Sequence, residues 1–504
     1  MSIFKEKDKR SDFIINPYVT SDRCVDTRSV QSIADSLSKP GMNARDKAIE
    51  VYNYIRRTMF HYRFLSKEAG GGGGAADLIN RVGYCLCTPT AGAQSHILQS
   101  MGVNARILGT TGHGSFVAEW DNRWHWMDAF LGLAAWNEGF DDLATPEQLK
   151  ADPGLLEREN PSPAPLLPCG DVLYSDILRF EPGNTEYEEK CGRTDVEWVE
   201  RCELSERRNY IWDNHFKPDI ILRPGESYTR NWDHEPGMYF LTGVDSKFAP
   251  PHHFCGEQAE RRDSVNWPYW RPYMKSIESF DPKTGEKQTV RTGRYWANGR
   301  LTWKPSLSVL EQFSETENVQ LIGDRLVPVD SDLPMKLTWR TDLPYFCQGG
   351  SLEVAGQGEM SVSIDTLDRQ GKLLAGMRNE CKTRFDLRPA FLEDLGTTGY
   401  RLCLELQGAC ACIESLEQTT VFQHNMYALP QLMPGRNEIK VDLTNPEVLK
   451  TNGFYVEFEW EGKDGGIRGK REKVESSPQI FSVEIDRATE DLPRMRKLTL
   501  ENTE

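Results

Sequence analysis

The chain has 504 residues, of which 38% are hydrophobic and 27% charged. That length and composition suit about three folded domains and exclude a wholly disordered chain. The 60 Lys and Arg against 76 Asp and Glu give a formal net charge of −16, so no nucleic-acid partner is expected. No segment approaches the roughly 20 consecutive apolar residues of a membrane-spanning helix, and no membrane partner is expected either.

The start of the chain and its cysteines bear on its compartment. The first ten residues are charged and lack an apolar centre, so they do not resemble a secretory leader. The 12 cysteines are irregularly spaced and too few for a disulfide scaffold. We therefore expect reduced thiols and a cytoplasmic protein, with a periplasmic or secreted location as the alternative if a leader has been removed. Nothing in the sequence indicates an oligomeric state.

Helices are predicted first along the chain. Asn43, with Asp46 three residues later, is typical of a helix start, and apolar residues at three- to four-residue spacing extend this helix to about residue 64. Five glycines at 70–74 predict a loop and not a phosphate site, because no strand precedes them and no Lys-Ser or Lys-Thr pair comes after them. A second helix is expected over 88–101, with Pro89 in its first turn.

Short strands and turns dominate the chain beyond this second helix, so the predicted fold class is α+β. Strands are expected over 103–108, 115–120 and 123–127, the last two joined by a turn at Asp121-Asn122. The proline-rich stretch 160–168 predicts a connector. We predict a first domain over 1–160 including an N-terminal extension, an aromatic-rich and partly β middle segment over 161–332, and a β-sandwich over 333–504.

Three side chains in the first domain have the pattern of a nucleophile, a base and an orienting acid. Cys87 precedes the second helix, where the helix dipole and free N–H groups favour a thiolate. Pairing across the Asp121-Asn122 turn places His113 on the same face as Asp128 and within side-chain reach of it. One hairpin can therefore present an imidazole and its carboxylate to the thiol.

These segments resemble the transglutaminase-like superfamily over about residues 44–150. The resemblance rests on Cys87 with Ala91 four residues later, on a turn after the helix, and on a His strand followed by an Asp strand. The matching stretches are Gly83-Tyr84-Cys85-Leu86-Cys87-Thr88-Pro89-Thr90-Ala91, Met101-Gly102-Val103-Asn104-Ala105-Arg106, Gly112-His113 and Arg123-Trp124-His125-Trp126-Met127-Asp128. It implies a papain-like domain with a Cys87, His113 and Asp128 triad. Residues 144–153 and 428–430 also resemble uncharacterised large bacterial proteins that carry this core.

Two features depart from the family pattern. Cys85 also follows a Gly-Tyr pair and competes with Cys87, but only Cys87 has the downstream spacing. The stretch between Arg106 and His113 is short, which leaves little room for the substrate loops of protein-crosslinking enzymes.

Other histidines and cysteines are expected to be structural. His125 is predicted to point away from the face of Asp128, and His96 lies more than two helical turns from Cys87. The pairs Cys85-Leu86-Cys87 and Cys410-Ala411-Cys412 lack a second ligand pair at the spacing of a zinc site. The run His252-His253-Phe254-Cys255 is more suggestive of a metal site, but adjacent histidines on a Pro-Pro loop are more often exposed. We expect no metal and no cofactor.

An aromatic run in the middle segment is the weaker candidate for a substrate-binding site. Trp267, Tyr269 and Trp270 can stack on sugar rings, and Arg271 can bind a carboxylate. Packing between domains accounts for the same residues and is the favoured interpretation.

The favoured function is a cysteine-nucleophile enzyme that acts on amide bonds through an acyl-thioester, by hydrolysis or acyl transfer, on peptide-like or peptidoglycan-like substrates. One alternative is a carbohydrate-active enzyme, a polysaccharide lyase or hydrolase on an adapted core of the same type. The other is a non-catalytic binding protein.

Overall fold

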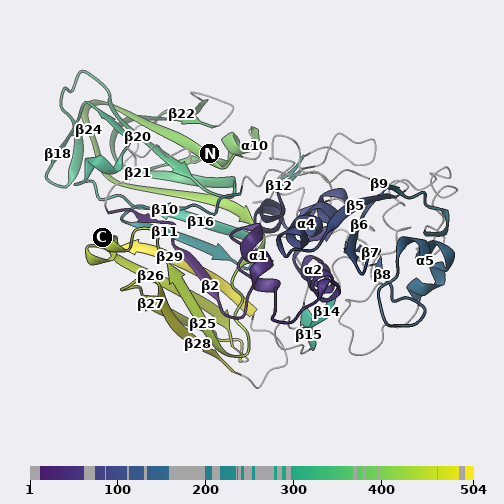
Figure 1. Cartoon of the computed structure of the whole chain (residues 1–504). Coiled ribbons are helices and arrows are strands. Elements are labelled where there is room, and N and C mark those ends of the chain that lie inside the picture. The colour runs from purple at the N-terminus through teal and green to yellow at the C-terminus, as the bar shows by residue number, and fades with distance from the viewer. Residues whose placement is uncertain are drawn as a thin grey trace.

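The computed structural model describes residues 12–61, 74–85, 87–110, 113–129, 133–157, 199–206, 216–233, 235, 240–242, 253–255, 277–280, 287–290, 297–366, 372–378, 382–393, 397–462, 464–486 and 494–503. Within these ranges helices gather in the N-terminal part and antiparallel strands form most of the rest (Figure 1). The predicted α+β class, with a β-rich C-terminal part, is confirmed. No helix in the described ranges is long and apolar enough to cross a membrane.

The N-terminal helices pack on one another around α4. They are α1 (Val30–Leu37), α2 (Ala44–Thr58), α3 (Ala75–Asp77), the π-helix η2 (Leu78–Val82) and α4 (Cys87–Ser100). The Asn43 side chain accepts a hydrogen bond from the Asp46 N–H at 2.9 Å, so the predicted N-cap is confirmed. Helix α2 ends at Thr58, earlier than expected, because Met59 has extended backbone angles.

A five-stranded sheet packs against α4. Its strand order is β8-β7-β6-β5-β9, with bounds β5 (Ala105–Thr110), β6 (His113–Trp120), β7 (Arg123–Asp128), β8 (Leu133–Ala134) and β9 (Ser205–Glu206). Phe116 lies opposite Met127, which confirms the predicted register. Asp121 and Asn122 both have positive φ, 50° and 60°, as a tight hairpin turn requires. The helices α5 (Pro146–Ala151) and η3 (Pro153–Glu157) lie between β8 and β9 in the chain.

The β-rich part is built on two long strands, β21 (Phe346–Asp365) and β24 (Gly399–His424), which pair with each other. The sequence between 352 and 364 also predicts two separate short strands, 352–354 and 360–364, but both are parts of β21, since glycines and register shifts bend this strand without ending it. The other strands of this 13-stranded sheet are β11 (Glu226–Asn231), β16 (Ala297–Trp303), β17 (Glu315–Glu317), β18 (Val319–Ile322), β19 (Arg325–Pro328), β20 (Met335–Asp342), β22 (Lys372–Arg378), β23 (Lys382–Asp386), β26 (Gly453–Glu461), β27 (Ile467–Lys473) and β29 (Arg494–Thr503).

Smaller elements complete the described chain. The three-stranded sheet contains β2 (Tyr18–Ser21), β25 (Gly435–Asp442) and β28 (Gln479–Ile485). The two-stranded pairs are β1 (Ile14–Ile15) with β10 (Ile221–Leu222), β3 (Phe60–His61) with β4 (Tyr84–Cys85), β12 (Phe240–Thr242) with β13 (His253–Cys255), and β14 (Ile277–Phe280) with β15 (Lys287–Val290). The short helices are η5 (Leu310–Gln312), α10 (Arg388–Glu393), η6 (Met426–Ala428) and η7 (Pro446–Lys450).

Strand pairing runs across the three sequence segments. Strands β1 and β2 of the N-terminal extension pair with β10 and β25, far along the chain. Strands β11 and β16 of the middle segment belong to the large sheet. Trp232 and Trp303, also from the middle segment, are buried in a core that continues into the N-terminal helices. The division into three domains stays a prediction.

One asparagine joins the large sheet to the N-terminal helices. The Asn425 Nδ2, just after β24, donates to the Thr58 carbonyl at 2.9 Å and to the Ile79 carbonyl at 2.7 Å. Its backbone N–H donates to the Asn80 carbonyl at 2.9 Å. Gly83 lies so close that an added Cβ would be 2.6 Å from the Asn425 Cγ. These contacts hold the C-terminal end of α2 and the helix η2 against β24.

We predict that Asn425→Ala lowers the free energy of unfolding by about 1–3 kcal/mol, because two buried carbonyls lose their donor. Urea denaturation followed by circular dichroism measures this change. The matched control is Asn104→Ala, which removes only an exposed hydrogen bond to Glu119 and should change stability by less than about 0.5 kcal/mol. Equal effects of the two substitutions would contradict the role of Asn425.

Candidate active site

Cys87 is the first residue of α4, and its side chain is partly exposed. The first turns of this helix are buried, and several of their residues are small, among them Ala91, Gly92 and Ala93. Strands β5 and β6 can therefore pack close to the N-terminus of α4. The position combines the positive end of the helix dipole with a cysteine that is not fully buried.

His113 and Asp128 lie on the neighbouring strands β6 and β7. The His113 Nε2 is 2.5 Å from the Asp128 Oδ2, and the two side chains are only 3% and 2% exposed. His113 is also fixed through its backbone, since the Thr110 hydroxyl donates to its carbonyl at 3.2 Å. The proximity of these two residues is as the hairpin register predicted.

The side chains of Cys87 and His113 are hydrogen-bonded to each other. Because the Nε2 of His113 faces Asp128, Nδ1 is the ring nitrogen left for the sulfur. The three residues therefore form a chain of contacts from sulfur to imidazole to carboxylate. The carboxylate fixes the ring orientation, and the ring presents its other nitrogen to the sulfur.

The electrostatics favour a thiolate and an imidazolium. Burial by itself would raise the pKa of Cys87, but the positive His113 and the hydrogen bonds from His113 and from the backbone of Gly114 outweigh it and lower this pKa. Burial would lower the pKa of His113, yet the charges of Asp128 and Cys87 and the hydrogen bonds to both raise it to about 10. Between these two pKa values both groups are charged and stabilise each other.

Gly114 is a site residue that the sequence did not reveal. Its backbone is hydrogen-bonded to the sulfur of Cys87. An added Cβ at Gly114 would lie 2.5 Å from the Thr88 Oγ1 and 3.3 Å from the Thr88 Cα. The absence of a side chain therefore lets β6 approach the first turn of α4. The only sequence signal is a glycine beside a candidate histidine, which is too common to identify such a contact.

The structure describes some of the other residues that the sequence analysis considered, and leaves others undescribed. Trp267, Tyr269, Trp270 and Arg271 lie outside the described residues, so their role in substrate binding stays a prediction. The side chain of Cys85 is also outside them. His125 has a packing role: its Nδ1 is 2.7 Å from the Leu143 carbonyl, and its ring stacks on Trp120 with a centroid distance of 3.8 Å.

Within the described ranges, no group of three or more His, Cys, Asp or Glu side chains is arranged to hold a metal ion. A scan of protein-family models and a search of curated proteins find no match to this chain. The geometry of the site therefore carries the functional argument.

We predict that the rate at which Cys87 is alkylated rises with pH at values below the ordinary thiol pKa of about 8.5 and then stays level toward pH 10. The lowered pKa of Cys87 sets the rise, and the raised pKa of His113 sets the end of the level region. Iodoacetamide labelling with peptide mass spectrometry measures the rate at this residue. In His113→Ala the rate should rise only at a pH above the ordinary thiol pKa, because the sulfur is still buried but no longer faces the imidazolium.

His96→Ala is the matched control for that profile, since His96 is a half-buried histidine on the same helix. It should leave the profile of Cys87 unchanged. A profile that rises only at the ordinary thiol pKa in the unaltered protein would show that the ion pair does not form.

We also predict that Gly114→Ala separates β6 from α4 and raises the pKa of Cys87. Thr88→Ala in the same chain removes the nearest clashing atom, the Oγ1, and should restore part of the alkylation rate at pH 7. A general loss of folding would not be rescued in this way. An alkylation profile unaffected by Gly114→Ala would contradict the close approach, and circular dichroism checks that each variant is folded.

Proposed function

We propose that the protein is a cysteine-nucleophile enzyme that acts on amide bonds through an acyl-thioester. The observation that carries the proposal is the contact chain of Cys87, His113 and Asp128, with a cysteine that is not fully buried at the N-terminus of α4. A nucleophile, a base in contact with it and a group that orients the base are the components of such catalysis.

The mechanism is set by the protonation states. The Cys87 thiolate attacks the amide carbonyl carbon, and His113 gives its Nδ1 proton to the leaving amine as the carbon–nitrogen bond breaks. Water, deprotonated by the now neutral His113, then attacks the thioester and releases the acid. Asp128 stabilises the imidazolium in the resting state and again as it reforms. The backbone N–H of Cys87, at the start of the helix, is a donor for the developing oxyanion.

We also propose that the N-terminal part has a papain-like core of the transglutaminase-like type. Three features support this: a helix that begins at Cys87, an antiparallel sheet packed against that helix, and the histidine and aspartate on adjacent strands of the sheet. The order cysteine, histidine, aspartate along the chain agrees with the resemblance.

We predict that Cys87→Ala lowers amide hydrolysis by at least about 10³-fold, because the variant lacks the proposed nucleophile. The assay screens a panel of peptides, peptidoglycan fragments and polysaccharides for turnover. Intact-mass spectrometry after rapid acid quenching detects the acyl-enzyme on the unaltered protein. The matched control is Cys202→Ala, which removes a buried cysteine whose thiol donates to the Val199 carbonyl and should leave turnover unchanged.

Three results would count against the proposal. Turnover of a polysaccharide that persists in Cys87→Ala would indicate elimination or hydrolysis of a glycan without a covalent thioester. Amide hydrolysis that persists in this variant would place the nucleophile elsewhere. The absence of turnover and of an acyl-enzyme with every substrate would favour a binding protein on the same core. Added hydroxylamine tests for the acyl-thioester itself, since its attack on the thioester carbonyl yields a hydroxamate and releases the Cys87 thiolate.

A further inference from the structure

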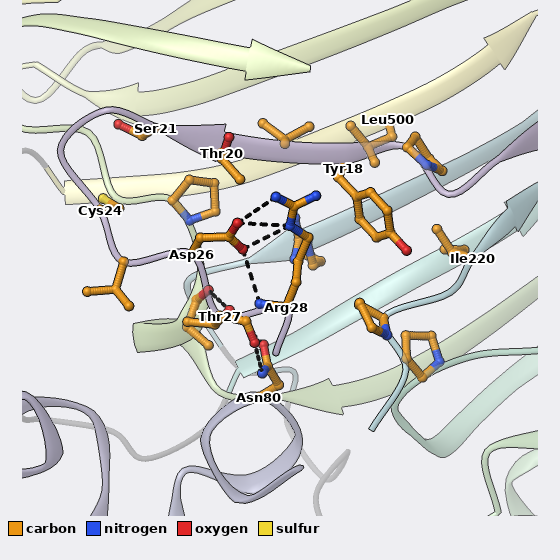
Figure 2. Close-up of a pocket in the computed structure, with 18 of the residues that line it drawn as sticks. Tyr18, Thr20, Ser21, Cys24, Asp26, Thr27, Arg28, Asn80, Ile220 and Leu500 are labelled. Atoms are coloured by element: carbon orange, nitrogen blue, oxygen red, sulfur yellow. Dashed lines mark hydrogen bonds and ion pairs between the residues drawn. The ribbon is translucent and has the colours of Figure 1, made fainter. Parts of the chain in front are cut away.

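A pocket lies between the N-terminal segment and the large sheet, and it contains none of the three candidate catalytic residues (Figure 2). Its interior volume is about 60 Å³. Segments far apart in the sequence line it: parts of 17–28 and 218–230, Asn80, 344–345, parts of 428–430, and Leu500. The pocket is therefore a product of the tertiary fold, and no sequence motif identifies it.

Cationic side chains outnumber carboxylates among the residues that line the pocket itself. The charged lining residues are Asp26, Arg28 and Arg230, two positive and one negative. Asp219 accepts a hydrogen bond from the lining Tyr18 hydroxyl and adds a second carboxylate beside the pocket. Anion binding here therefore depends on guanidinium donors that lack a carboxylate partner, and not on an excess of positive charge.

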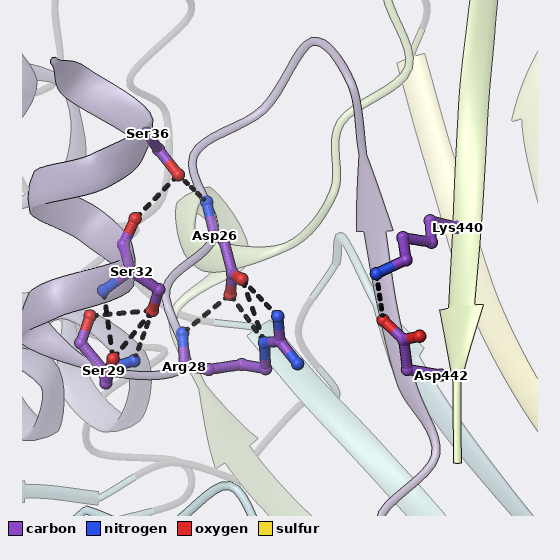
Figure 3. Close-up of polar contacts among 7 residues, drawn as sticks. All are labelled: Asp26, Arg28, Ser29, Ser32, Ser36, Lys440 and Asp442. Atoms are coloured by element: carbon purple, nitrogen blue, oxygen red, sulfur yellow. Dashed lines mark hydrogen bonds and ion pairs between the residues drawn. The ribbon is translucent and has the colours of Figure 1, made fainter. Parts of the chain in front are cut away.

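Arg28 is held in place by Asp26 (Figure 3). The Arg28 Nε donates to the two carboxylate oxygens at 2.9 and 3.0 Å, and Nη2 donates to Oδ2 at 2.5 Å. Asp26 is itself fixed, because its N–H donates to the Ser36 Oγ at 3.0 Å. The guanidinium carbon lies 4.9 Å from the centroid of the Tyr18 ring. Nη1 has no hydrogen-bond partner in the described part of the chain.

Arg230 supplies the second unpaired donor. Its Nε is buried and has no hydrogen-bond partner among the described residues. The tyrosine hydroxyls are engaged elsewhere. Tyr18 donates to Asp219 at 3.2 Å, and Tyr228 is hydrogen-bonded to Tyr345. The lining groups without partners among the described residues include donors from two guanidinium groups, so a complementary ligand carries an acceptor.

We propose that this pocket binds a free short-chain carboxylate. The Nε edge of Arg230 would pair with the two carboxylate oxygens, and the Nη1 of Arg28 would donate to one of them. The hydrocarbon part would lie against apolar wall residues such as Ile220 and Leu500. The interior holds about four to six water-sized groups, which matches an acid of about that many non-hydrogen atoms. This site is independent of the proposed amide chemistry.

Isothermal titration calorimetry with butyrate, at constant ionic strength, tests the proposal on the full chain. We expect one site per chain, with butyramide, the uncharged isostere, binding at least about tenfold more weakly. Arg230→Gln should weaken butyrate binding by at least about tenfold. Arg325→Gln, the matched control, removes a half-exposed arginine paired with Glu414 on the large sheet and should leave the affinity unchanged.

Several outcomes would overturn this assignment. They are no butyrate binding to the unaltered chain, equal binding of butyramide, and unchanged binding in Arg230→Gln. If Arg230→Gln does not fold, Arg230→Lys decides, since it keeps the charge but loses the planar donor edge and should still weaken binding about fivefold. Binding of N-acetylglutamate methylamide without binding of butyrate would indicate a peptide side chain in place of a free acid.

Discussion

The candidate site depends on a charged pair, Cys87 and His113, in a largely buried setting. Burial opposes the charge on each member, and the pair exists only because the two charges face each other and Asp128 supports the imidazolium. Such a balance is sensitive to distance, since the attraction between charges is stronger in a protein interior than in water. The structure must therefore hold a helix terminus and a β-hairpin in a fixed relation.

The surrounding fold meets this constraint with close packing. Gly114 brings β6 against the first turn of α4, and Thr110 fixes the backbone of His113. Helix α2, which packs on the sulfur-bearing α4, is anchored in turn to the large sheet through Asn425, just after β24, and so is η2. The N-terminal extension adds strands β1 and β2 to the β-rich part. The catalytic proposal thus rests on contacts made by both parts of the chain.

Local patterns in the sequence were enough to predict the hairpin of β6 and β7 and the helix α4. The turn at Asp121-Asn122 sets the register of β6 and β7, and the register brings His113 to Asp128. Longer-range features had no such signal. The merging of predicted short strands into β21 depends on pairing with β24, and Gly114 matters only because Thr88 lies across from it. The pocket with Arg28 and Arg230 joins residues about 200 positions apart, which local periodicity cannot reveal.

The protonation state of His113 tests the central claim most directly. Nuclear magnetic resonance of the protein with labelled histidines, assigned with His113→Ala, reports the charge of each imidazole as a function of pH. The account predicts that His113 remains an imidazolium at pH 8 and that its pKa falls in Cys87→Ser, where the thiolate is missing. A neutral His113 at pH 7 in the unaltered protein, or a pKa that does not change in Cys87→Ser, would contradict it.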